Sequence, residues 1–450
     1  MKQFFLLLSF FFAFYDARAG ELLNKLQAIK EISDIQEVKE ETFKEAYVFF
    51  YEQAIDHDNL SVGSFKQKVF LGHKDTLKVV VAELEGYAMN STRANELSKL
   101  LDANQLKIEH RFFDKSVPSS GIAWEQLTVE QAATDCHLII ETLKEKLYPH
   151  SKWVSTGISK GGQATIMHRY FYPEDVDVSV PYVAPLNLER IDPRIEKFLN
   201  KVGTQKLTLT NFVFAPGGET ENCSWRVRDF QKLCFTHKAV LQKMLEDEAE
   251  KKGYEFQLVG GFERAVELII LEYKFAFWQY SGECSTIPIE SSDAADEEDL
   301  REVFEHLIRI SPPSFFADSD ITKMYPFMYA AYIELGFYDY KKKHFKQYLS
   351  KDVPNQGNIT FDFALPQGIA LKPFNKAQMK AVKKWLQTDA DKILFIYGEN
   401  DPWSATAVDL KMNSKCSKYV KGGLGHACQI KDFEAITRQD ILDTLKEWLR

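Results

Sequence analysis

The chain has 450 residues, of which 45% are hydrophobic and 27% charged, and its formal net charge is −9. This composition is ordinary for a globular protein with a large core. The length leaves room for one long α/β unit or for two or three average domains. No block of basic residues interrupts the chain, which argues against a nucleic-acid partner.

The N-terminus has the pattern of a cleaved secretory signal. Lys2 provides a positive charge, residues 4–15 form an almost unbroken apolar run, and Ala17-Arg18-Ala19 has the small-x-small form of a cleavage site. The run is too short to span a bilayer, and no later stretch is long and apolar enough to do so. We therefore expect residues 1–19 to be a signal peptide rather than a buried helix. The mature chain, from Gly20, would then be periplasmic or fully secreted and carry no membrane anchor.

The six cysteines fit an oxidising compartment. None has the spacing of a zinc site, and no H-E-x-x-H motif is present, so we expect neither a metal nor a cofactor. Two pairs lie close together in the sequence, and we predict disulfides for both, Cys223–Cys234 and Cys416–Cys428. Cys136 and Cys284 could pair with each other or stay free.

Residues 66–187 alternate between strand and helix signals. The run Val79-Val80-Val81-Ala82 is typical of a strand buried on both faces, and Thr128 suits the N-cap of a helix. This alternation indicates a parallel sheet covered by helices. Strands are expected at 68–71, 78–84, 106–113, 153–156 and 178–183, and helices at 128–147 and 163–171.

Residues 188–371 differ from this pattern, because strand signals fade and aromatic helical stretches replace them. The acidic run at 293–299 fits the solvated start of a helix better than a cation site, since apolar positions follow it at helical spacing. Helices are expected at 230–250, 261–280, 296–310 and 325–340.

From residue 372 the α/β pattern returns. Helices are expected at 376–386 and 433–448, and strands at 393–397 and 419–420. The sequence therefore predicts one α/β domain, residues 20–187 and 372–450, interrupted by a mostly helical insertion, residues 188–371.

The strongest chemical signal is the pentapeptide Gly157-Ile158-Ser159-Lys160-Gly161. It follows an expected strand and precedes an expected helix, which is the context that the nucleophile elbow of a serine hydrolase requires. Glycines are needed because the sharp turn leaves no room for neighbouring side chains, and the helix N-terminus offers free N–H groups to a developing oxyanion. We predict that Ser159 is a nucleophile, although a glycine-rich turn without catalysis would give the same local pattern.

Two later turns supply partners for this serine. Asp401 follows the expected strand at 393–397, at the carboxyl end of the sheet, where functional side chains project. His426 follows a glycine-rich segment beyond the strand at 419–420. Alone, each has a plain explanation as a surface turn or loop residue. Together, in the order Ser159, Asp401, His426, they predict the triad of an α/β-hydrolase fold with an inserted, mostly helical cap domain.

The oxyanion hole is expected to consist of backbone N–H groups. Lys160 follows the nucleophile and would donate one of them. The segment Glu85-Gly86-Tyr87, after an early strand, would donate the second from Gly86 or Tyr87. Gly86 would let the backbone approach a substrate closely, although an ordinary turn glycine is an equal interpretation.

Four segments carry a family resemblance when they are taken together. They are L-E-G-Y at 84–87, E-H-R-F-F at 109–113, L-T-V-E-Q-A at 127–132 and T-G-I-S-K-G-G at 156–162. In this combination the chain resembles the secreted bacterial prolyl tri/tetrapeptidyl aminopeptidases, a family similar to the lysosomal prolyl carboxypeptidase and dipeptidyl peptidase group. Ile158 and Lys160 depart from the prolyl carboxypeptidase pattern around the serine.

The resemblance implies a helical cap over the active site, formed by residues 188–371, and a preference for proline near the scissile bond. It also implies that a cap segment at 329–337 brings an aromatic face and the carboxylate of Glu334 towards the substrate. These aromatics would equally pack the core of the cap. An enzyme that binds a peptide N-terminus must hold an ammonium group, for which Glu85 and Glu334 are the candidates.

These features predict a secreted serine exopeptidase that releases short, tripeptide-like N-terminal peptides through an acyl-enzyme. An esterase or lipase on the same triad is one alternative. A proline-specific carboxypeptidase is another and would need Arg or Lys to hold a terminal carboxylate. A non-catalytic binding protein is a third, against which an intact triad argues. Peptides are the expected partners, and the sequence leaves the oligomeric state open.

Overall fold

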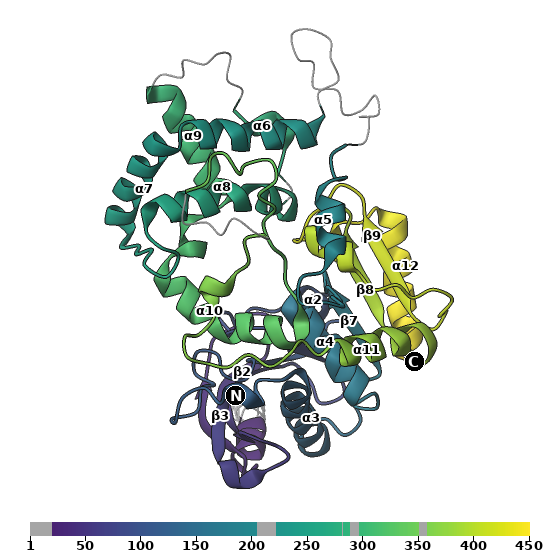
Figure 1. Ribbon diagram of the computed structural model, residues 1–450. Coiled ribbons are helices and arrows are strands. Elements are labelled where there is room, and N and C mark those ends of the chain that lie inside the picture. Colours follow the sequence, from purple (N-terminus) through teal and green to yellow (C-terminus); the bar gives the residue numbers. More distant parts are fainter. Residues whose placement is uncertain (1–19, 205–221, 281, 289–296, 351–357) are drawn as a thin grey trace, which may run out of the picture.

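The centre of the protein is a nine-stranded mixed sheet, seen in the computed structural model (Figure 1). The structure describes residues 20–204, 222–280, 282–288, 297–350 and 358–450, so the expected signal peptide lies outside the described residues. The strands are β1 (Ile32–Glu37), β2 (Glu45–Ala54), β3 (Ser64–His73), β4 (Val80–Leu84), β5 (Asn104–Ile108), β6 (Trp153–Ile158), β7 (Val178–Tyr182), β8 (Leu394–Gly398) and β9 (Ser417–Lys421).

The strand order is β1-β2-β3-β5-β4-β6-β7-β8-β9. Strands β1, β2, β3 and β5 pair antiparallel, and every pair from β5 through β9 is parallel. If β1 at the edge is set aside, this is the arrangement of the α/β-hydrolase fold. In that fold β5 lies between β3 and β4, and β3 is the one strand that runs antiparallel to the others. The fold class predicted from the sequence is confirmed.

Helices cover both faces of this sheet. Side chains of α3 (Val129–Lys146) pack on one face with Val80 and Ala82, and α12 (Ala435–Trp448) packs on the other with Val81 and Val154. Neighbouring strand residues thus enter opposite cores, as the two-residue period of a strand requires. Helix α4 (Lys160–Phe171) lies on the α3 side, next to α11 (Lys376–Thr388).

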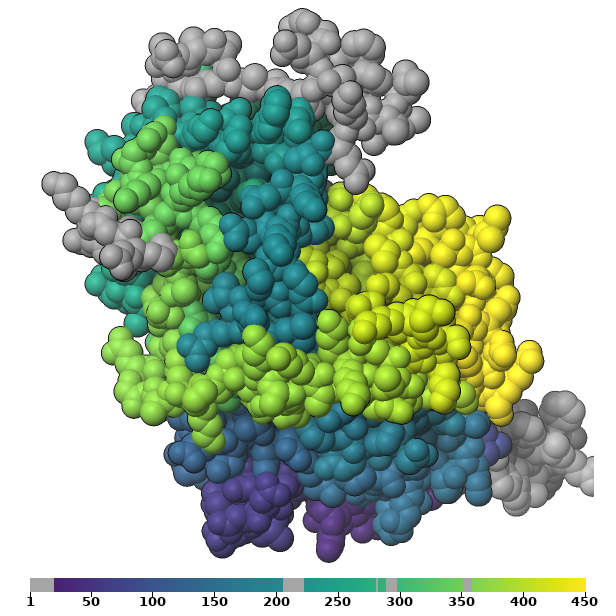
Figure 2. Space-filling view, turned by 45° about the vertical axis from the view of Figure 1, so that its right-hand side comes forward, coloured from purple at the N-terminus to yellow at the C-terminus, as the bar shows by residue number. Residues whose placement is uncertain are grey.

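Between β7 and β8 the chain forms a separate group of helices, here called the helical region. Its described helices are α5 (Pro193–Leu199), α6 (Cys223–Thr236), α7 (Lys238–Lys252), α8 (Phe262–Gln279), α9 (Glu297–Ile310) and α10 (Asp318–Ala330). Figure 1 shows α6 to α9 standing apart from the sheet, and in Figure 2 the teal and green lobe lies beside the yellow C-terminal residues. No helix in the described ranges is both long and apolar enough to cross a membrane.

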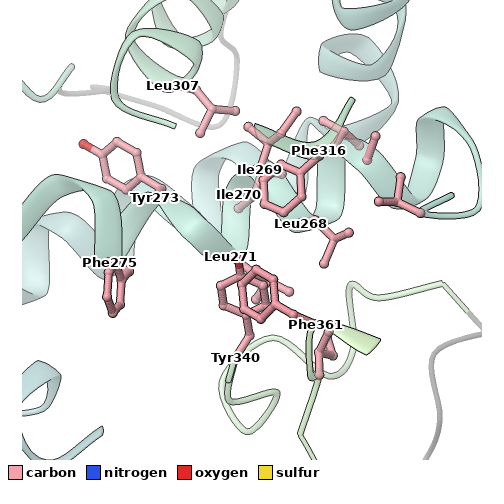
Figure 3. Packing of buried hydrophobic residues seen from close by; sticks show 14 of the residues in the cluster. Leu268, Ile269, Ile270, Leu271, Tyr273, Phe275, Leu307, Phe316, Tyr340 and Phe361 are labelled. Atoms are coloured by element: carbon pink, nitrogen blue, oxygen red, sulfur yellow. The ribbon is translucent and has the colours of Figure 1, made fainter. Parts of the chain in front are cut away.

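Helix α8 is the centre of the helical region. Its residues 265–273 and 275–278 are all buried, as expected of a helix enclosed by others rather than lying on a surface. Figure 3 shows its residues 268–271 and Tyr273 packed with Leu307 of α9 and with Phe316. The helical region therefore has a hydrophobic core of its own, distinct from the two cores on the sheet.

Most expected elements are confirmed within a few residues, and three differ. The helix expected at 230–250 is two helices, α6 and α7, which meet at His237. Strand β5 ends at Ile108, short of the expected 113, because the chain turns where Phe112 has a φ of 66°. One helix was expected at 325–340, but α10 ends at Ala330 and a π-helical turn, Ala331–Leu335, follows it; residues 336–340 are not helical.

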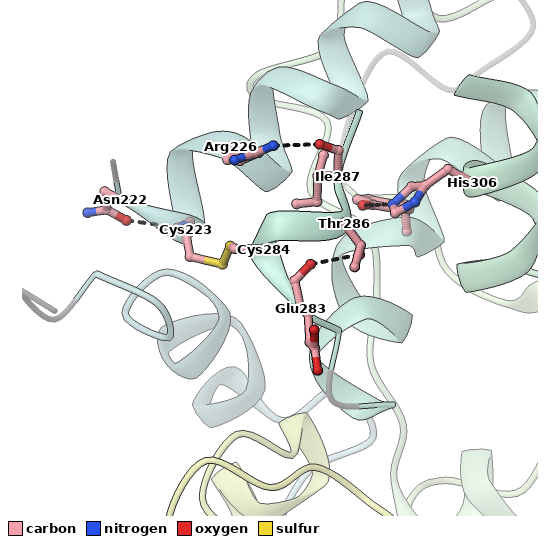
Figure 4. Close-up of a disulfide and its surroundings, with 10 residues drawn as sticks. Asn222, Cys223, Arg226, Glu283, Cys284, Thr286, Ile287 and His306 are labelled. Carbon is pink, nitrogen blue, oxygen red and sulfur yellow. Dashed lines mark hydrogen bonds between the residues drawn. A yellow bond between two sulfur atoms is a disulfide. The ribbon is translucent and has the colours of Figure 1, made fainter. Parts of the chain in front are cut away.

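The predicted Cys223–Cys234 disulfide is wrong. Both residues belong to α6 and are separated by three helical turns, about 16 Å at 1.5 Å per residue, whereas a disulfide joins Cα atoms less than about 7 Å apart. Cys223 instead forms a disulfide with Cys284, with the Cα atoms 5.7 Å apart (Figure 4). This disulfide ties the start of α6 to the chain after α8.

The predicted Cys416–Cys428 disulfide is also wrong. Cys416 lies before β9 in the core on the α4 side of the sheet, and Cys428 lies beyond β9 in the core on the α12 side. Both thiols are buried and unpaired, and they donate to the carbonyl groups of Ala390 and Tyr397. The sheet itself separates the two sulfur atoms.

Candidate active site

Ser159 stands in a strained turn between β6 and α4. Its φ of 59° and ψ of −119° are rare for a residue with a side chain and are the mark of a nucleophile elbow. The turn is so tight that a Cβ on Gly157 would lie 2.2 Å from the carbonyl oxygen of Gly161. A Cβ on Gly162 would lie 2.7 Å from the side chain of Ala184. The glycines of the motif are therefore required by the space available.

Asp401 and His426 meet at the ends of β8 and β9. The Nδ1 atom of His426 lies 2.9 Å from Oδ2 of Asp401. Asp401 is fully buried, and its Oδ1 accepts a hydrogen bond from the backbone N–H of Trp403. The histidine loop crosses so closely over the end of β8 that a Cβ on Gly398 would lie 2.2 Å from the carbonyl oxygen of Gly425. The carboxylate is thus held in place by its own turn and fixes the imidazole.

Ser159 lines a cavity beside which the His426 loop is anchored, and no hydrogen bond joins Ser159 to His426 in the described part of the chain. The backbone N–H of His426 donates to the carbonyl oxygen of Gln279 at 2.7 Å, and Gln279 lines a cavity of about 450 Å³ together with Ser159. Catalytic hydrogen bonds are often long in unliganded enzymes and shorten when substrate binds. The structure brings Asp401 and His426 together, and Gln279 connects the His426 loop to the cavity that Ser159 lines.

The predicted oxyanion residues surround the same turn. A Cβ on Gly86 would lie 2.6 Å from the backbone nitrogen of Gly161, so only glycine fits there. The side chain of Lys160 turns back and its Nζ donates to the carbonyl oxygen of Gly86 at 2.5 Å. Lys160 also begins α4, in the turn whose backbone N–H groups have no acceptor within the helix. The loop and the start of α4 are therefore locked together.

The environment of Lys160 and Tyr87 is almost free of water. The ammonium of Lys160 lies 4.8 Å from the centre of the Phe113 ring and 5.5 Å from that of Tyr87. Burial lowers the pKa of Lys160 well below its usual value. Burial also raises the pKa of Tyr87, an effect that the adjacent Ser159 hydroxyl partly offsets. The tyrosine side chain is therefore a neutral neighbour of the serine.

The opposite wall of the cavity comes from the helical region and the chain that follows it. Its surface is largely aromatic and includes Phe327, Phe337, Tyr338 and Trp403. The ring centres of Phe337 and Trp403 are 5.4 Å apart. The volume is within the range of ordinary small-ligand sites. The cavity can accept an apolar or ring-shaped group close to Ser159.

One buried carboxylate lies in this aromatic wall. Glu272 of α8 lines the cavity, and its Oε2 accepts hydrogen bonds from the hydroxyl groups of Tyr338, at 2.9 Å, and Tyr340, at 2.7 Å. No Lys, Arg or His of the described residues forms an ion pair with it. Burial raises the pKa of Glu272 to about 7, against the opposing effect of the two tyrosines.

The sequence reasoning missed Glu272 because α8 has no motif. The helix has two buried carboxylates, Glu267 and Glu272; Glu267 is paired with Lys238 and Arg264, whereas Glu272 has no basic partner among the described residues. Charged residues are almost never fully buried unless something pairs with them. A buried acid without a basic partner, in a wall that faces a serine, is therefore a candidate binding residue.

Glu85 and Glu334, the predicted substrate carboxylates, do not line this cavity. Glu85 lies 3.2 Å from Nζ of Lys107 and contacts a much smaller cavity behind Lys160. Burial raises its pKa to about 7. The Oε2 of Glu334 accepts a hydrogen bond from the backbone N–H of Val129 at 2.8 Å and so supports the first turn of α3. Both carboxylates already have partners within the protein.

The E-H-R segment lies beneath the site rather than in it. The guanidinium of Arg111 is fully buried and binds both carboxylate oxygens of Asp135 at 2.7 Å. Glu109 accepts hydrogen bonds from the backbone N–H of Met89 and the hydroxyl of Ser116. These contacts fix the chain that follows β5, against which Tyr87 packs through Phe113.

Comparison with known proteins gives a consistent result. The model of the family described as PS-10 peptidase S37 matches residues 15–444. The prolyl tri/tetrapeptidyl aminopeptidase of Streptomyces mobaraensis is 29% identical over 409 residues, which are 89% of this chain and 79% of that protein.

Solved structures resemble the chain more distantly. The proline iminopeptidase of Mycobacterium smegmatis has a TM-score of 0.37 and 10% identity, over 92% of this chain and 98% of that one. The esterase E22 has a TM-score of 0.38 and 11% identity, over 90% of this chain and 99% of that one.

Proposed function

Since this chain belongs to the PS-10 peptidase S37 family and is a serine peptidase, we propose that it is an exported aminopeptidase. It releases short peptides from the free N-terminus of its substrates and cleaves after proline. Ser159 is the nucleophile, His426 the general base and Asp401 the residue that orients the imidazole. Residues 188–371 act as the cap that encloses the substrate.

The chemistry follows from the placement of these side chains. Because Nδ1 of His426 is held by Asp401, its Nε2 is the nitrogen that takes the proton of Ser159 and later gives it to the leaving amine. The Ser159 oxygen bonds to the carbonyl carbon, the peptide nitrogen leaves with that proton, and water then hydrolyses the acyl-enzyme. The backbone N–H of Lys160 and that of Gly86 or Tyr87 stabilise the oxyanion, at a few kcal/mol each.

The observation that carries the aminopeptidase assignment is Glu272. A peptide N-terminus brings a cation into a desolvated cavity, and such a charge must be paired with a buried anion. Glu272 is a buried carboxylate with hydrogen bonds but no basic partner, in the cavity that contains Ser159. An arriving ammonium group would complete its ion pair. Glu272 therefore takes the role that the sequence had suggested for Glu85 and Glu334.

Two further observations support the substrate and the compartment. The aromatic wall around Phe337 and Trp403 suits the flat, apolar ring of proline, in agreement with the name of the Streptomyces relative. The Cys223–Cys284 disulfide is typical of an oxidising compartment, in agreement with a signal peptide at residues 1–19.

The alternatives fit this cavity less well. A carboxypeptidase needs a free cation for the terminal carboxylate. The two lysines that line the cavity are both engaged, Lys160 with Gly86 and Lys323 with Asp320. An esterase or lipase has no use for a buried carboxylate in its acyl groove.

The direct test compares three versions of one substrate, a tripeptide ending in proline and linked to a short acceptor peptide. The first version has both termini free, the second is N-acetylated and the third is C-amidated. We expect acetylation to reduce kcat/KM at least about tenfold and amidation to have little effect, with an intact tripeptide as the product. Equal rates for the free and acetylated peptides, or a loss caused by amidation, would reverse the assignment.

A further inference from the structure

A second cavity lies behind the aromatic wall of the catalytic one. It has a volume of about 340 Å³ and is bounded by α5, α6, α8 and the chain after Tyr340. Tyr338 lines both cavities, and its ring stacks on Phe275 with the centres 3.7 Å apart. The stacked pair separates the two spaces, so a ligand in the second cavity would not reach Ser159.

The charges around this second cavity do not balance. Its carboxylates are already engaged: Glu196 and Asp339 lie 3.3 and 3.1 Å from Nζ of Lys341, and Asp192 binds the guanidinium of Arg194 at 2.8 Å. Four basic residues remain in the lining, namely Arg228, Lys274, Lys343 and His344. The cavity thus has an excess of positive charge.

Two of these basic groups, Lys274 and Arg228, are partly enclosed and incompletely paired. Lys274 of α8 forms no hydrogen bond or ion pair with any described residue, and burial together with the charge of Arg228 lowers its pKa to about 8. The Nε atom of Arg228 is buried and has no hydrogen-bond acceptor; it makes a long ion pair of 3.8 Å with the exposed carboxylate of Asp229, and the Arg228 side chain is 39% exposed. Two cations that repel each other inside one cavity are stabilised when an anion binds between them.

The rest of the lining is mostly apolar, with four uncharged polar residues, Asn200, Thr204, Ser224 and Gln231. Leu271 and Phe275 of α8 lie on one side, and Tyr340 and Phe345 on another. A fully hydrated inorganic anion gains nothing from such walls, whereas an organic acid buries its apolar body against them. The combination of aromatic walls with an unpaired ammonium and a guanidinium that has only a long contact to an exposed carboxylate is suited to a carboxylate on an apolar group.

We propose that this second cavity binds a carboxylate-bearing organic ligand, with the carboxylate between Arg228 and Lys274 and the apolar body against Phe275. A small organic acid and the C-terminus of a peptide both offer this chemistry. The site is separate from the catalytic cavity and does not depend on the proposed peptidase mechanism.

The test uses phenylpropionate, which has a carboxylate on an apolar body, titrated by calorimetry into the purified full-length enzyme. We expect saturable binding with a Kd of about 1 mM or lower. Its uncharged amide should bind at least about tenfold more weakly. Lys274→Met and Arg228→Gln should each weaken phenylpropionate binding by a similar factor, because each removes one charge that faces the ligand.

Matched controls separate binding from damage to the fold. Lys251→Met removes an exposed lysine at the end of α7 and should bind phenylpropionate as the wild type does. Each variant should keep the wild-type rate of labelling of Ser159 by a fluorophosphonate, which shows that the enzyme is folded. Absence of saturable binding, equal binding of the amide, or unchanged affinity in both cavity variants would overturn the proposal.

Two further titrations identify whether the carboxylate belongs to a peptide C-terminus or to a free organic acid. In the Ser159→Ala background, a peptide with a free C-terminal phenylalanine is titrated beside its C-terminal amide. Tighter binding of the free acid, lost with Lys274→Met, assigns the site to a peptide C-terminus, whereas binding of phenylpropionate alone assigns it to a free organic acid. Inorganic phosphate that binds as tightly as phenylpropionate, with the same loss in the variants, would show a simple anion site and contradict an organic ligand.

Discussion

The two walls of the catalytic cavity are built in different ways. On the sheet side, Ser159, Asp401 and His426 each follow a strand, and backbone geometry sets their positions. On the helical side, Glu272 is held by the hydroxyl groups of two tyrosines from a distant part of the chain. A tight backbone turn requires glycines and so produces a recognisable sequence motif, whereas side-chain packing between distant segments produces no such motif. Short sequence motifs therefore mark the proposed catalytic residues, but no such motif marks the proposed binding residue Glu272.

The largest expected effect comes from the sheet side. Ser159→Ala and His426→Ala should each reduce kcat by at least about 10⁴-fold, and the double variant by little more, because triad residues act as a unit. Folding should be unaffected, since alanine has the same Cβ as serine and leaves the strain of the turn unchanged. Peptide turnover and thermal unfolding measure the two effects. Activity within about tenfold of wild type in either variant would remove that residue from the triad.

A smaller loss of kcat is expected from Gly86→Ala, which tests whether the close backbone contact at Gly86 positions the proposed oxyanion loop. The added Cβ would lie 2.6 Å from the nitrogen of Gly161 and from Cβ of Lys160, so the loop must move away from the serine. We expect kcat to fall about 10²-fold, as for the loss of one oxyanion donor, with little change in KM. Gly20→Ala is the matched control for a glycine outside the site, where no atom lies within 4 Å of the added Cβ and the backbone does not have a positive φ. A larger effect of the control than of Gly86→Ala would contradict this assignment.

The helical side should show its own dependence on pH. Glu272 has a pKa of about 7 because of burial, so it becomes a carboxylate as the pH rises through 7, while a peptide amine loses its proton above about 8. The preference for a free over an acetylated N-terminus should therefore rise severalfold from pH 5 to 7.5 and fall above pH 8. Taking the ratio of the two kcat/KM values cancels the titration of the triad. A ratio that does not change with pH would argue against Glu272.

The smallest effect on activity is expected from the Cys223–Cys284 disulfide, which closes a loop with a sequence separation of 61. Replacing both cysteines with serine should lower the unfolding free energy by about 2–5 kcal/mol. The rate of fluorophosphonate labelling of Ser159 should stay within about twofold, because the elbow belongs to the sheet. Guanidinium unfolding measures the first effect. A reductant should lower the stability of the wild type and leave the variant unchanged.

The same contrast explains what the sequence could and could not predict. The strands β6, β8 and β9 and the turns after them were predictable, because a buried apolar run followed by a glycine-rich turn is a local pattern. Strand β2 was missed, although it pairs with β3 over its full length from Glu45 to Ala54. Its run Tyr47-Val48-Phe49-Phe50-Tyr51 is rich in residues that favour strands, so a local signal was present and was overlooked.

Long-range contacts account for the wrong disulfides and for the placement of the carboxylates. Proximity in sequence favoured Cys223 with Cys234, but helix α6 keeps them apart, and the partner Cys284 comes near only when α6 packs against α8. Glu334 had the expected residue type, yet it supports the start of α3. The acid that faces the cavity, Glu272, lies in a helix whose pattern indicated only a buried core.

The most direct test of the role of Glu272 combines one substitution with one substrate change. The kcat/KM values for a free tripeptide substrate and for its N-acetylated twin are measured with wild type and with Glu272→Gln, and fluorophosphonate labelling confirms that the variant is folded. Losing a buried charge partner is costly, so wild type should prefer the free amine at least about tenfold. Glu272→Gln should act on the acetylated peptide within about threefold of the wild-type rate and lose the preference. A preference for the free amine that persists in Glu272→Gln would show that another group binds the N-terminus.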